Sequence, residues 1–192
     1  MLLTLSVVID QFDIVKYCSL MSQSPTERFH LAPAPAGLQV VQNLLNTRAI
    51  DAYGLPDLLA DGKAASLVWE TALSDDDAAT LRALRSDVEA AIAGDLPTRP
   101  AVRAELLPGG DGTVRLMPTG TGTDYIASRM WSEVLLAQQA DTWRRLKRCK
   151  NEACGSAFYD RSRNNSGVWH DVKTCGNVAN LRASRARKKA MD

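Results

Sequence analysis

The sequence has no apolar run long enough to cross a membrane. The longest run, MLLTLSVVI at the start, ends at Asp10, well short of the ~18 to 20 residues that a membrane-spanning helix needs. No basic stretch precedes this run and no small-residue cleavage site follows it, so it does not resemble a secretory signal. We therefore expect a cytoplasmic protein with no membrane partner.

Histidine and cysteine are also scarce, with two and four copies. The sequence contains no nucleophile–base pairing, no phosphate-binding loop and no dinucleotide fingerprint. We therefore expect no catalytic residue and no enzymatic activity. Three of the four cysteines fall in one short basic segment, which fits metal binding better than disulfide formation.

The chain as a whole lacks charge of one sign, since its formal net charge is only +1. The charge is unevenly distributed, however. Residues 1–143 hold 10 basic and 18 acidic side chains, whereas residues 144–192 hold 13 basic and 4 acidic ones. This division predicts two parts with different roles, of which only the basic part should seek a polyanion.

Three segments are expected along the chain. Residues 1–36, rich in serine, proline and alanine, predict a poorly ordered leader, and Met21 is an alternative start for the natural protein. The other reading of residues 1–20 is a short strand or helix packed on the core. Residues 37–143 predict a helical regulatory or sensor domain, and residues 144–192 a small metal-binding module.

Apolar periodicity and capping residues predict a mostly α fold. Ser74, three following aspartates and Gly94 indicate both ends of one helix, whose buried stripe would be Leu81, Leu84, Val88 and Ile92. A Pro-Gly-Gly-Asp-Gly turn predicts one β-hairpin over 101–120. The expected helices cover residues 38–47, 55–61, 64–72, 75–93 and 123–146, the last leading directly into the metal-binding module.

Cys149 and Cys154 form a pair with four residues between them, and His170 and Cys175 form a second pair with the same spacing. Fifteen residues separate the two pairs, which is the arrangement of a tetrahedral zinc site. Because the protein fills all four positions, we expect one structural Zn²⁺ ion. Cys18 and His30 have no partner in the sequence and are read as ordinary residues.

The end of the chain predicts a basic helix. Asn177 is a suitable N-cap, and Val178 and Leu181 would pack toward the zinc site. The other face would present cations to DNA, or to RNA, with additional contacts from the loop between the ligand pairs. The candidate nucleic-acid-binding residues are Arg161, Arg163, Arg182, Arg185, Arg187, Lys188 and Lys189. The alternative is a solvated helix, or one that pairs with the acidic part of the same chain.

The C-terminal part combines RLKRC, CKNEACG, FYDRSRN, a tryptophan before the third ligand, and CGN at residues 175–177. Through these features it resembles the CGNR zinc finger. The upstream part resembles the helical ABATE-type domain of stress-induced transcription regulators, through NLLNTR and LRALRSDVEAAI. His170 stands where the family has a cysteine, which zinc accepts, and Val178 stands where the family motif has an arginine.

The resemblance implies a stress-related transcription regulator that binds DNA through its finger. The helical domain would sense a small-molecule ligand, pair with a second copy of the chain, or do both. Trp69, Trp131 and Trp143 would line a pocket or belong to the core. Two other functions remain open: an RNA-binding protein of zinc-ribbon type, and a protein-interaction module in which zinc is only a structural staple.

Overall fold

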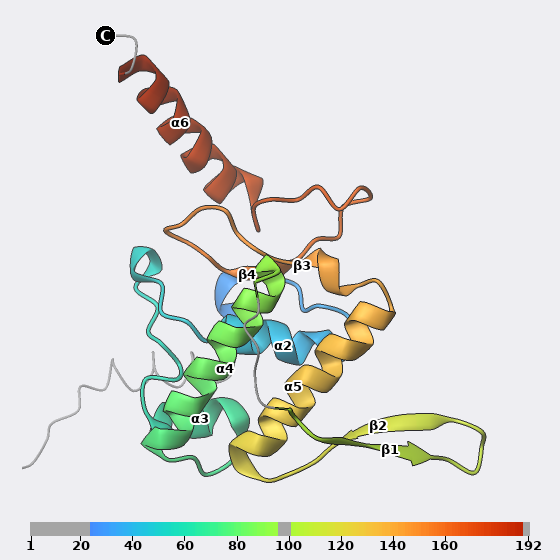
Figure 1. Ribbon diagram of the computed structural model, residues 1–192. Helices are drawn as coiled ribbons and strands as arrows, with labels where there is room; N and C mark the ends of the chain where they lie inside the picture. The colour runs from blue at the N-terminus through green and yellow to red at the C-terminus, as the bar shows by residue number, and fades with distance from the viewer. Residues whose placement is uncertain (1–23, 96–100, 190–192) are drawn as a thin grey trace, which may run out of the picture.

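The computed structural model describes residues 24–95 and 101–189 and is mostly helical (Figure 1). The α-helices are α2 (Leu38–Leu45), α3 (Gly62–Trp69), α4 (Asp75–Ala93), α5 (Gly122–Gln139) and α6 (Asn177–Lys189). Three short 3₁₀-helices, η1 (Glu27–Phe29), η2 (Asp51–Tyr53) and η3 (Trp143–Arg145), and one π-helix, η4 (Val172–Gly176), accompany them. The expected fold class is confirmed, because the regular structure besides helices consists of two small hairpins in the described residues.

Helices α2, α4 and α5 pack against one another and form the main core. Leu44, Leu81 and Met130, one from each helix, are completely buried. Helix α3 packs against α4 at the edge of this group. The predicted apolar stripe of α4 therefore faces the core, and of its four residues only Ile92, at the end of the helix, is half-buried.

Helix α4 begins and ends where its caps predict. The Ser74 hydroxyl accepts a hydrogen bond from the backbone N–H of Asp77, and the Asp77 carboxylate accepts one from the N–H of Ser74. This reciprocal pair satisfies two of the free donors at the start of a helix. Gly94 ends α4 in the left-handed conformation, with φ of 77°, which glycine adopts at little cost.

The helix predicted at 55–61 is a turn instead. The side chain of Asp57 accepts a hydrogen bond from the N–H of Leu59 and pairs with Arg85 of α4. Aspartate competes in this way with the helical backbone, and the turn leaves Leu59 fully buried. The apolar residues of this segment thus reach the core without a helix.

The last helix of this part is shorter than predicted. Helix α5 ends at Gln139, and Asp141 follows with φ of 54°. Helix η3 and strand β3 (Leu146–Arg148) then lead to the first cysteine of the metal-binding motif. The reversal at Asp141 turns the chain back, so Leu146 is buried in the main core.

The predicted hairpin consists of β1 (Ala104–Pro108) and β2 (Val114–Pro118), which pair antiparallel. It projects from the helical body in Figure 1, and all five residues of β1 are exposed. Leu106 and Leu116 lie opposite each other, with Leu106 70% exposed. A second hairpin, β3 with β4 (Ala157–Tyr159), was not expected from the sequence.

Part of the expected leader packs against the body. Phe29 and Ala34 are buried, and the Arg28 guanidinium donates a hydrogen bond to the carbonyl of Pro56. The expectation of a poorly ordered leader therefore does not hold for residues 24–36, which pack against the body. The expectations for residues 1–23, including Met21 and Cys18, lie outside the described residues.

Among the helices of the described ranges, none combines the length and apolar character that a membrane span requires.

Candidate metal centre

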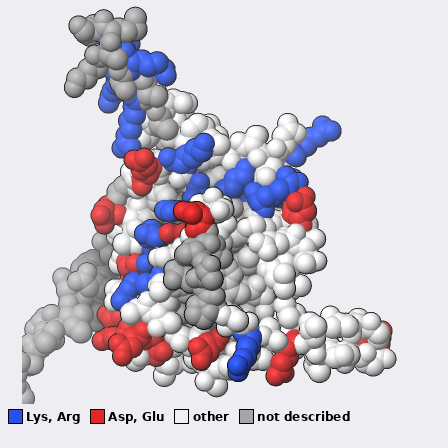
Figure 2. All heavy atoms as spheres, in the orientation of Figure 1, with Lys and Arg blue, Asp and Glu red and all other residues white. Residues whose placement is uncertain are grey.

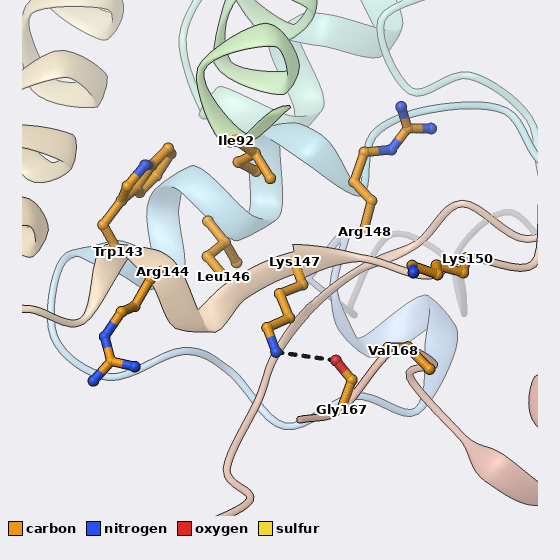
Figure 3. Close-up of a pocket in the computed structure, with 9 residues that line it drawn as sticks. All are labelled: Ile92, Trp143, Arg144, Leu146, Lys147, Arg148, Lys150, Gly167 and Val168. Atoms are coloured by element: carbon orange, nitrogen blue, oxygen red, sulfur yellow. Dashed lines mark hydrogen bonds between the residues drawn. The ribbon is translucent and has the colours of Figure 1, made fainter. Parts of the chain in front are cut away.

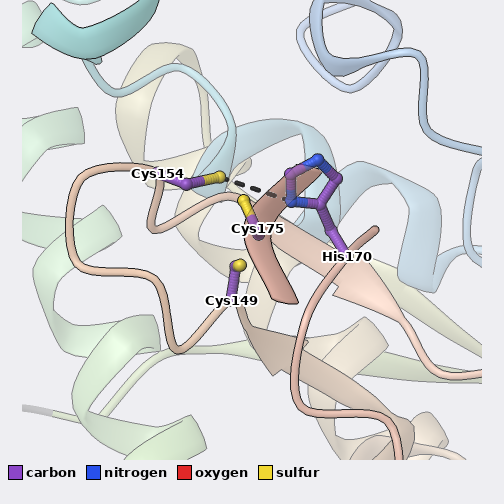
Figure 4. Close-up of side chains that lie close together, drawn as sticks. All are labelled: Cys149, Cys154, His170 and Cys175. Atoms are coloured by element: carbon purple, nitrogen blue, oxygen red, sulfur yellow. Dashed lines mark hydrogen bonds between the residues drawn. The ribbon is translucent and has the colours of Figure 1, made fainter. Parts of the chain in front are cut away.

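The four predicted zinc ligands come together above the helical body. Cys149 follows β3, Cys154 lies in the turn before β4, and His170 and Cys175 lie on the segment that leads into α6. One donor atom from each residue lies within 4.8 Å of the others. Figure 4 shows the four side chains turned toward one another. Sequence positions that span 27 residues therefore converge on a single point.

The first ligand pair is held by a tight turn between β3 and β4. The N–H of Cys149 donates to the carbonyl of Ser156 at 2.9 Å, and the N–H of Cys154 donates to the carbonyl of Asn151 at 2.8 Å. Gly155 has φ of 61°, so a larger residue there would be strained. These bonds orient both thiols toward the same point.

The second ligand pair is held by two different contacts. The N–H of Lys150 donates to the carbonyl of Val168 at 3.0 Å, which draws the second loop against the first. Asp171 then caps η4, because its carboxylate accepts a hydrogen bond from the N–H of Lys173 at 2.7 Å. Cys175 lies within η4 and is completely buried.

The donor set fits one zinc ion. In a tetrahedral site with Zn–S bonds of ~2.3 Å and a Zn–N bond of ~2.0 Å, sulfur and nitrogen donors lie about 3.5 to 3.8 Å apart. Cys154 Sγ and His170 Nδ1 are 3.4 Å apart, so Nδ1 is the nitrogen that faces the metal position. Three thiols and one imidazole fill all four positions, and such a closed site is structural rather than catalytic.

Neighbouring polar groups support two of the thiols. The side-chain amide of Asn151 donates to Cys175 Sγ at 3.2 Å, and the Ser156 hydroxyl lies 3.3 Å from Cys154 Sγ. Hydrogen bonds of this kind orient metal ligands and stabilise the negative charge of a thiolate. They are the part of the site that the cysteine and histidine spacing did not reveal.

The thiols are also prepared electrostatically. A hydrogen bond from Cys149, with others from His170 and Ser156, lowers the pKa of Cys154 although burial opposes the change. The same hydrogen bond, together with burial, raises the pKa of Cys149. The shared hydrogen bond therefore favours the thiolate form of Cys154, which is the form in which cysteine binds zinc.

The helical body contacts the metal centre directly. The hydroxyl of Tyr53, in η2, lies 3.6 Å from Cys175 Sγ, and this contact raises the pKa of Tyr53. The side chain of Asn46, at the end of α2, exchanges two hydrogen bonds with the backbone of Ala157: it accepts one at 2.8 Å and donates one at 2.9 Å. The metal centre and the helical core thus share buried contacts.

The candidate nucleic-acid-binding residues lie in two places, the loop between the ligand pairs and helix α6. Arg161 is held by the body, since its guanidinium donates to the carbonyl of Pro33 at 2.7 Å and lies 5.6 Å from the centre of the Tyr159 ring. Arg163 is exposed in the loop between the ligand pairs. The others lie on α6, and those whose side chains are described are exposed: Arg182, Arg185, Arg187 and Lys188. Lys189 is the last residue of α6.

Helix α6 differs from the expectation in two respects. Its backbone continues from η4, so Asn177 has helical dihedral angles and is no N-cap; Asp171 caps η4 instead. Val178 and Leu181 are 39% and 57% exposed rather than packed toward the zinc site. The helix leaves the metal centre at an angle that carries it away from the body (Figure 1).

Two other sequence predictions concern histidine and tryptophan. His30 is exposed at the end of η1 and lies outside the four-residue cluster. Trp69 and Trp131 are partly buried against the main core, whereas Trp143 is partly buried and also lines a cavity beside β3. The sequence feature that corresponds to this cavity is Trp143 directly before the basic stretch RRLKRCK.

Comparison with known families agrees with this geometry. Residues 145–188 match the family model described as the CGNR zinc finger, and the segment includes all four ligands of the cluster. The chain therefore carries a CGNR-type zinc-binding module, and the resemblance drawn from the sequence is confirmed for this segment. The match does not extend to the upstream helices, whose resemblance stays a prediction. No curated protein matches the chain.

Proposed function

We propose that the protein is a cytoplasmic transcription regulator that binds DNA through its zinc finger and α6, and that it is not an enzyme. The observation that carries the proposal is the position of α6. The helix stands clear of the body at the top of Figure 1, and Figure 2 shows Lys and Arg side chains along it. Within the described ranges, no carboxylate pairs with its exposed arginines Arg182, Arg185 and Arg187.

An unsupported helix of this length needs a partner. Isolated helices of about 12 to 15 residues are marginally stable in water, and α6 has 13 residues with their apolar side chains Val178 and Leu181 exposed. A polyanion would offset the mutual repulsion of its cations. The partner that best stabilises α6 is therefore a nucleic acid.

The geometry suits duplex DNA. An α-helix with its side chains is about 10 to 12 Å wide, which matches the major groove of about 12 Å. The continuous backbone from η4 to α6 fixes the direction of the helix relative to the metal centre. Zinc would in this way orient the DNA-contacting helix without touching DNA itself.

The test is a binding series of the zinc-loaded protein against random duplex DNA and structured RNA, measured by fluorescence anisotropy between about 50 and 300 mM salt. The logarithm of affinity should fall linearly with that of the salt concentration. Arg182→Ala/Arg185→Ala should weaken binding to all sequences and reduce the slope for duplex DNA by about 2. Lys63→Ala/Arg115→Ala, which removes one exposed cation from α3 and one from the β1–β2 hairpin, is the matched control.

Each result has a definite reading. Preference for duplex DNA supports the proposal, and preference for structured RNA favours the RNA-binding alternative. If the wild-type protein binds neither at about 50 mM salt, the nucleic-acid proposal is overturned.

A protein-interaction module is the second candidate, because Val178 and Leu181 leave an apolar strip at the foot of α6. Self-association through a second copy and a small-molecule ligand of the helical body belong to the main proposal. The exposed leucines and valine of the β1–β2 hairpin, Leu106, Leu107 and Val114, support self-association. Light scattering of the purified chain measures the oligomeric state directly.

A further inference from the structure

The cavity lined by Trp143 lies beside the metal centre, between the end of α4 and strand β3. We call it the recess. Its volume is about 460 Å³, within the range of about 300 to 1,000 Å³ that small-ligand sites occupy. Figure 3 shows the residues around it. They are Ile92, Trp143, Arg144, Leu146, Lys147, Arg148, Lys150, Gly167 and Val168.

The recess combines an apolar floor with a cationic rim. Leu146 is 2% exposed, and Ile92 and Trp143 are partly buried against the same core, so the floor is fixed by the body of the protein. Four of the nine lining residues are lysine or arginine and none is acidic. In Figure 3 the Trp143 ring lies on one side, and Arg148 and Lys150 lie on the other.

Two of the four cations are engaged in the structure of the finger. The Lys147 ammonium donates to Asp160 at 2.7 Å and to the carbonyls of Asn165 and Gly167. Arg144 forms two hydrogen bonds with Asp141, each of 2.8 Å. Lys147 thus holds the wall formed by the second loop, whereas the Arg144–Asp141 pair is exposed at the surface.

The other two cations are available to a ligand. Arg148 donates only long hydrogen bonds, of 3.4 Å to the carbonyl of Gly155 and of 3.5 Å to Glu89, and Glu89 already accepts two from Arg48. Lys150 is exposed, and its ammonium has neither a hydrogen bond nor an ion pair with the part of the chain that the structure describes. An aromatic ring opposite two available cations is suited to a planar group that carries a negative charge.

We propose that this recess binds one nucleotide unit of a single-stranded nucleic acid, with the base against Trp143 and the phosphate held by Arg148 and Lys150. Stacking of bases on aromatic rings beside basic side chains is the general way in which proteins hold single strands. The choice of a nucleic acid rests on the proposed function, whereas a free nucleotide offers the same chemistry. The site lies on β3 and η3 and is separate from α6.

The experiment uses the zinc-loaded full chain with two probes, a thymidine hexanucleotide and 5′-AMP. The readout is the indole N–H signal of Trp143 in a ¹⁵N-correlated NMR spectrum, identified by its loss in Trp143→Phe. We expect the hexanucleotide to shift this signal. Lys150→Glu should weaken binding by about tenfold or more, the range that single phosphate and stacking contacts give.

Further variants separate the site from the fold and from α6. Arg148→Gln should weaken binding less than Lys150→Glu, and metal analysis of both variants should still give one zinc per chain. Lys63→Glu makes the same charge change at an exposed position on α3 and should leave hexanucleotide binding unchanged. In Arg182→Ala/Arg185→Ala the hexanucleotide should still shift the Trp143 signal, because neither residue lines the recess.

The outcomes distinguish this proposal from the proposed function. If duplex DNA binds but neither probe shifts the Trp143 signal at millimolar concentration, the recess proposal is overturned and the function of α6 stands. If AMP shifts the signal while no nucleic acid binds, the recess is a site for free nucleotides and the nucleic-acid function fails. If both probes shift it and Lys150→Glu weakens both, the recess accepts a nucleotide unit from either source.

Discussion

His170 is the residue on which the metal assignment depends most, because it replaces a thiol in a site otherwise made of cysteines. Its Nδ1 atom faces Cys154 Sγ at 3.4 Å, a separation that fits two ligands of one zinc ion. The other three members of the cluster are all cysteines, so no second histidine can take its place. Loss of the imidazole therefore opens one of four coordination positions.

We predict that His170→Ala lowers the zinc content of the purified protein below one ion per chain. His30→Ala is the matched control, since His30 is the only other histidine and lies outside the cluster. Metal analysis after dialysis against a weak chelator measures the difference. One full zinc per chain in His170→Ala would show that His170 is not a ligand.

Asn46 explains part of a sequence motif that the spacing of apolar residues leaves unexplained. In NLLNTR, Asn46 forms two hydrogen bonds with Ala157, Thr47 accepts one from Arg85, and Arg48 pairs with Glu89. The polar residues of this motif thus connect α2 to β4 and α4. Their partners lie about 40 to 110 residues away, so the sequence alone does not identify them.

Substitution Asn46→Ala should reduce the free energy of unfolding by about 1 to 3 kcal/mol, because it leaves the buried N–H of Ala157 without an acceptor. Gln39→Ala, on the exposed side of α2, should change it by less than about 0.5 kcal/mol. Urea denaturation followed by circular dichroism gives both values. Equal effects of the two substitutions would contradict a special role for Asn46.

At the scale of elements, the sequence predicted those structures that local signals specify. Ser74 and Gly94 mark the two ends of α4, and the glycine-rich turn marks the β1–β2 hairpin. The failures fall where tertiary contacts decide. Asp57 turns the chain toward Arg85 instead of continuing a helix, and the reversal at Asp141 ends α5 early.

The same distinction applies to the metal centre. Spacing identified all four ligands, because paired ligands at short range form each half of the site. Tyr53 and Asn151, which contact Cys175, were missed because their role depends on how separate segments pack. The outward direction of α6 was missed for a similar reason, since an amphipathic pattern does not say whether a packing partner exists.

The Asp57 turn should make stability depend on pH. Burial alone would raise the pKa of Asp57, but hydrogen bonds from Arg85 and Leu59 hold it below its ordinary value. A lowered pKa in the folded state stabilises the fold above the unfolded pKa of about 3.9, and this contribution is lost as the pH falls through the folded value.

We therefore predict that Asp57→Asn destabilises the protein at pH 6, where it leaves the buried Arg85 without its carboxylate, by about 3 kcal/mol or somewhat less because Asp57 is partly exposed. The difference between wild type and variant should narrow from pH 6 to pH 3. Urea denaturation at several pH values measures it, with the exposed substitution Asp51→Asn as control. If the difference in unfolding free energy between wild type and Asp57→Asn does not change with pH, the Asp57–Arg85 ion pair is not its source.

At the scale of the whole molecule, the two strands beside the first ligand pair contribute to the core of the helical body, while the three ligand cysteines form a second buried cluster with Phe158. Leu146 and Ala157, on the two strands next to the first ligand pair, belong to the same buried cluster as Leu44 and Leu81. Asn46 and Tyr53 add polar contacts from the body to the finger. Metal binding should for this reason stabilise parts of the helical body as well as the finger.

Zinc removal should accordingly loosen α2 as well as the finger. Without metal, the few large apolar residues of the finger cannot offset its chain entropy, and β4 then no longer holds Asn46 and the end of α2. We predict faster amide hydrogen exchange across α2 after chelation, measured by mass spectrometry, and its reversal when zinc is added back. The β1–β2 hairpin, which projects from the far end of the body, is the internal control and should exchange at the same rate throughout. Faster exchange confined to residues 145–188, with α2 unchanged, would show that the shared core does not carry the effect of the metal into the helical body.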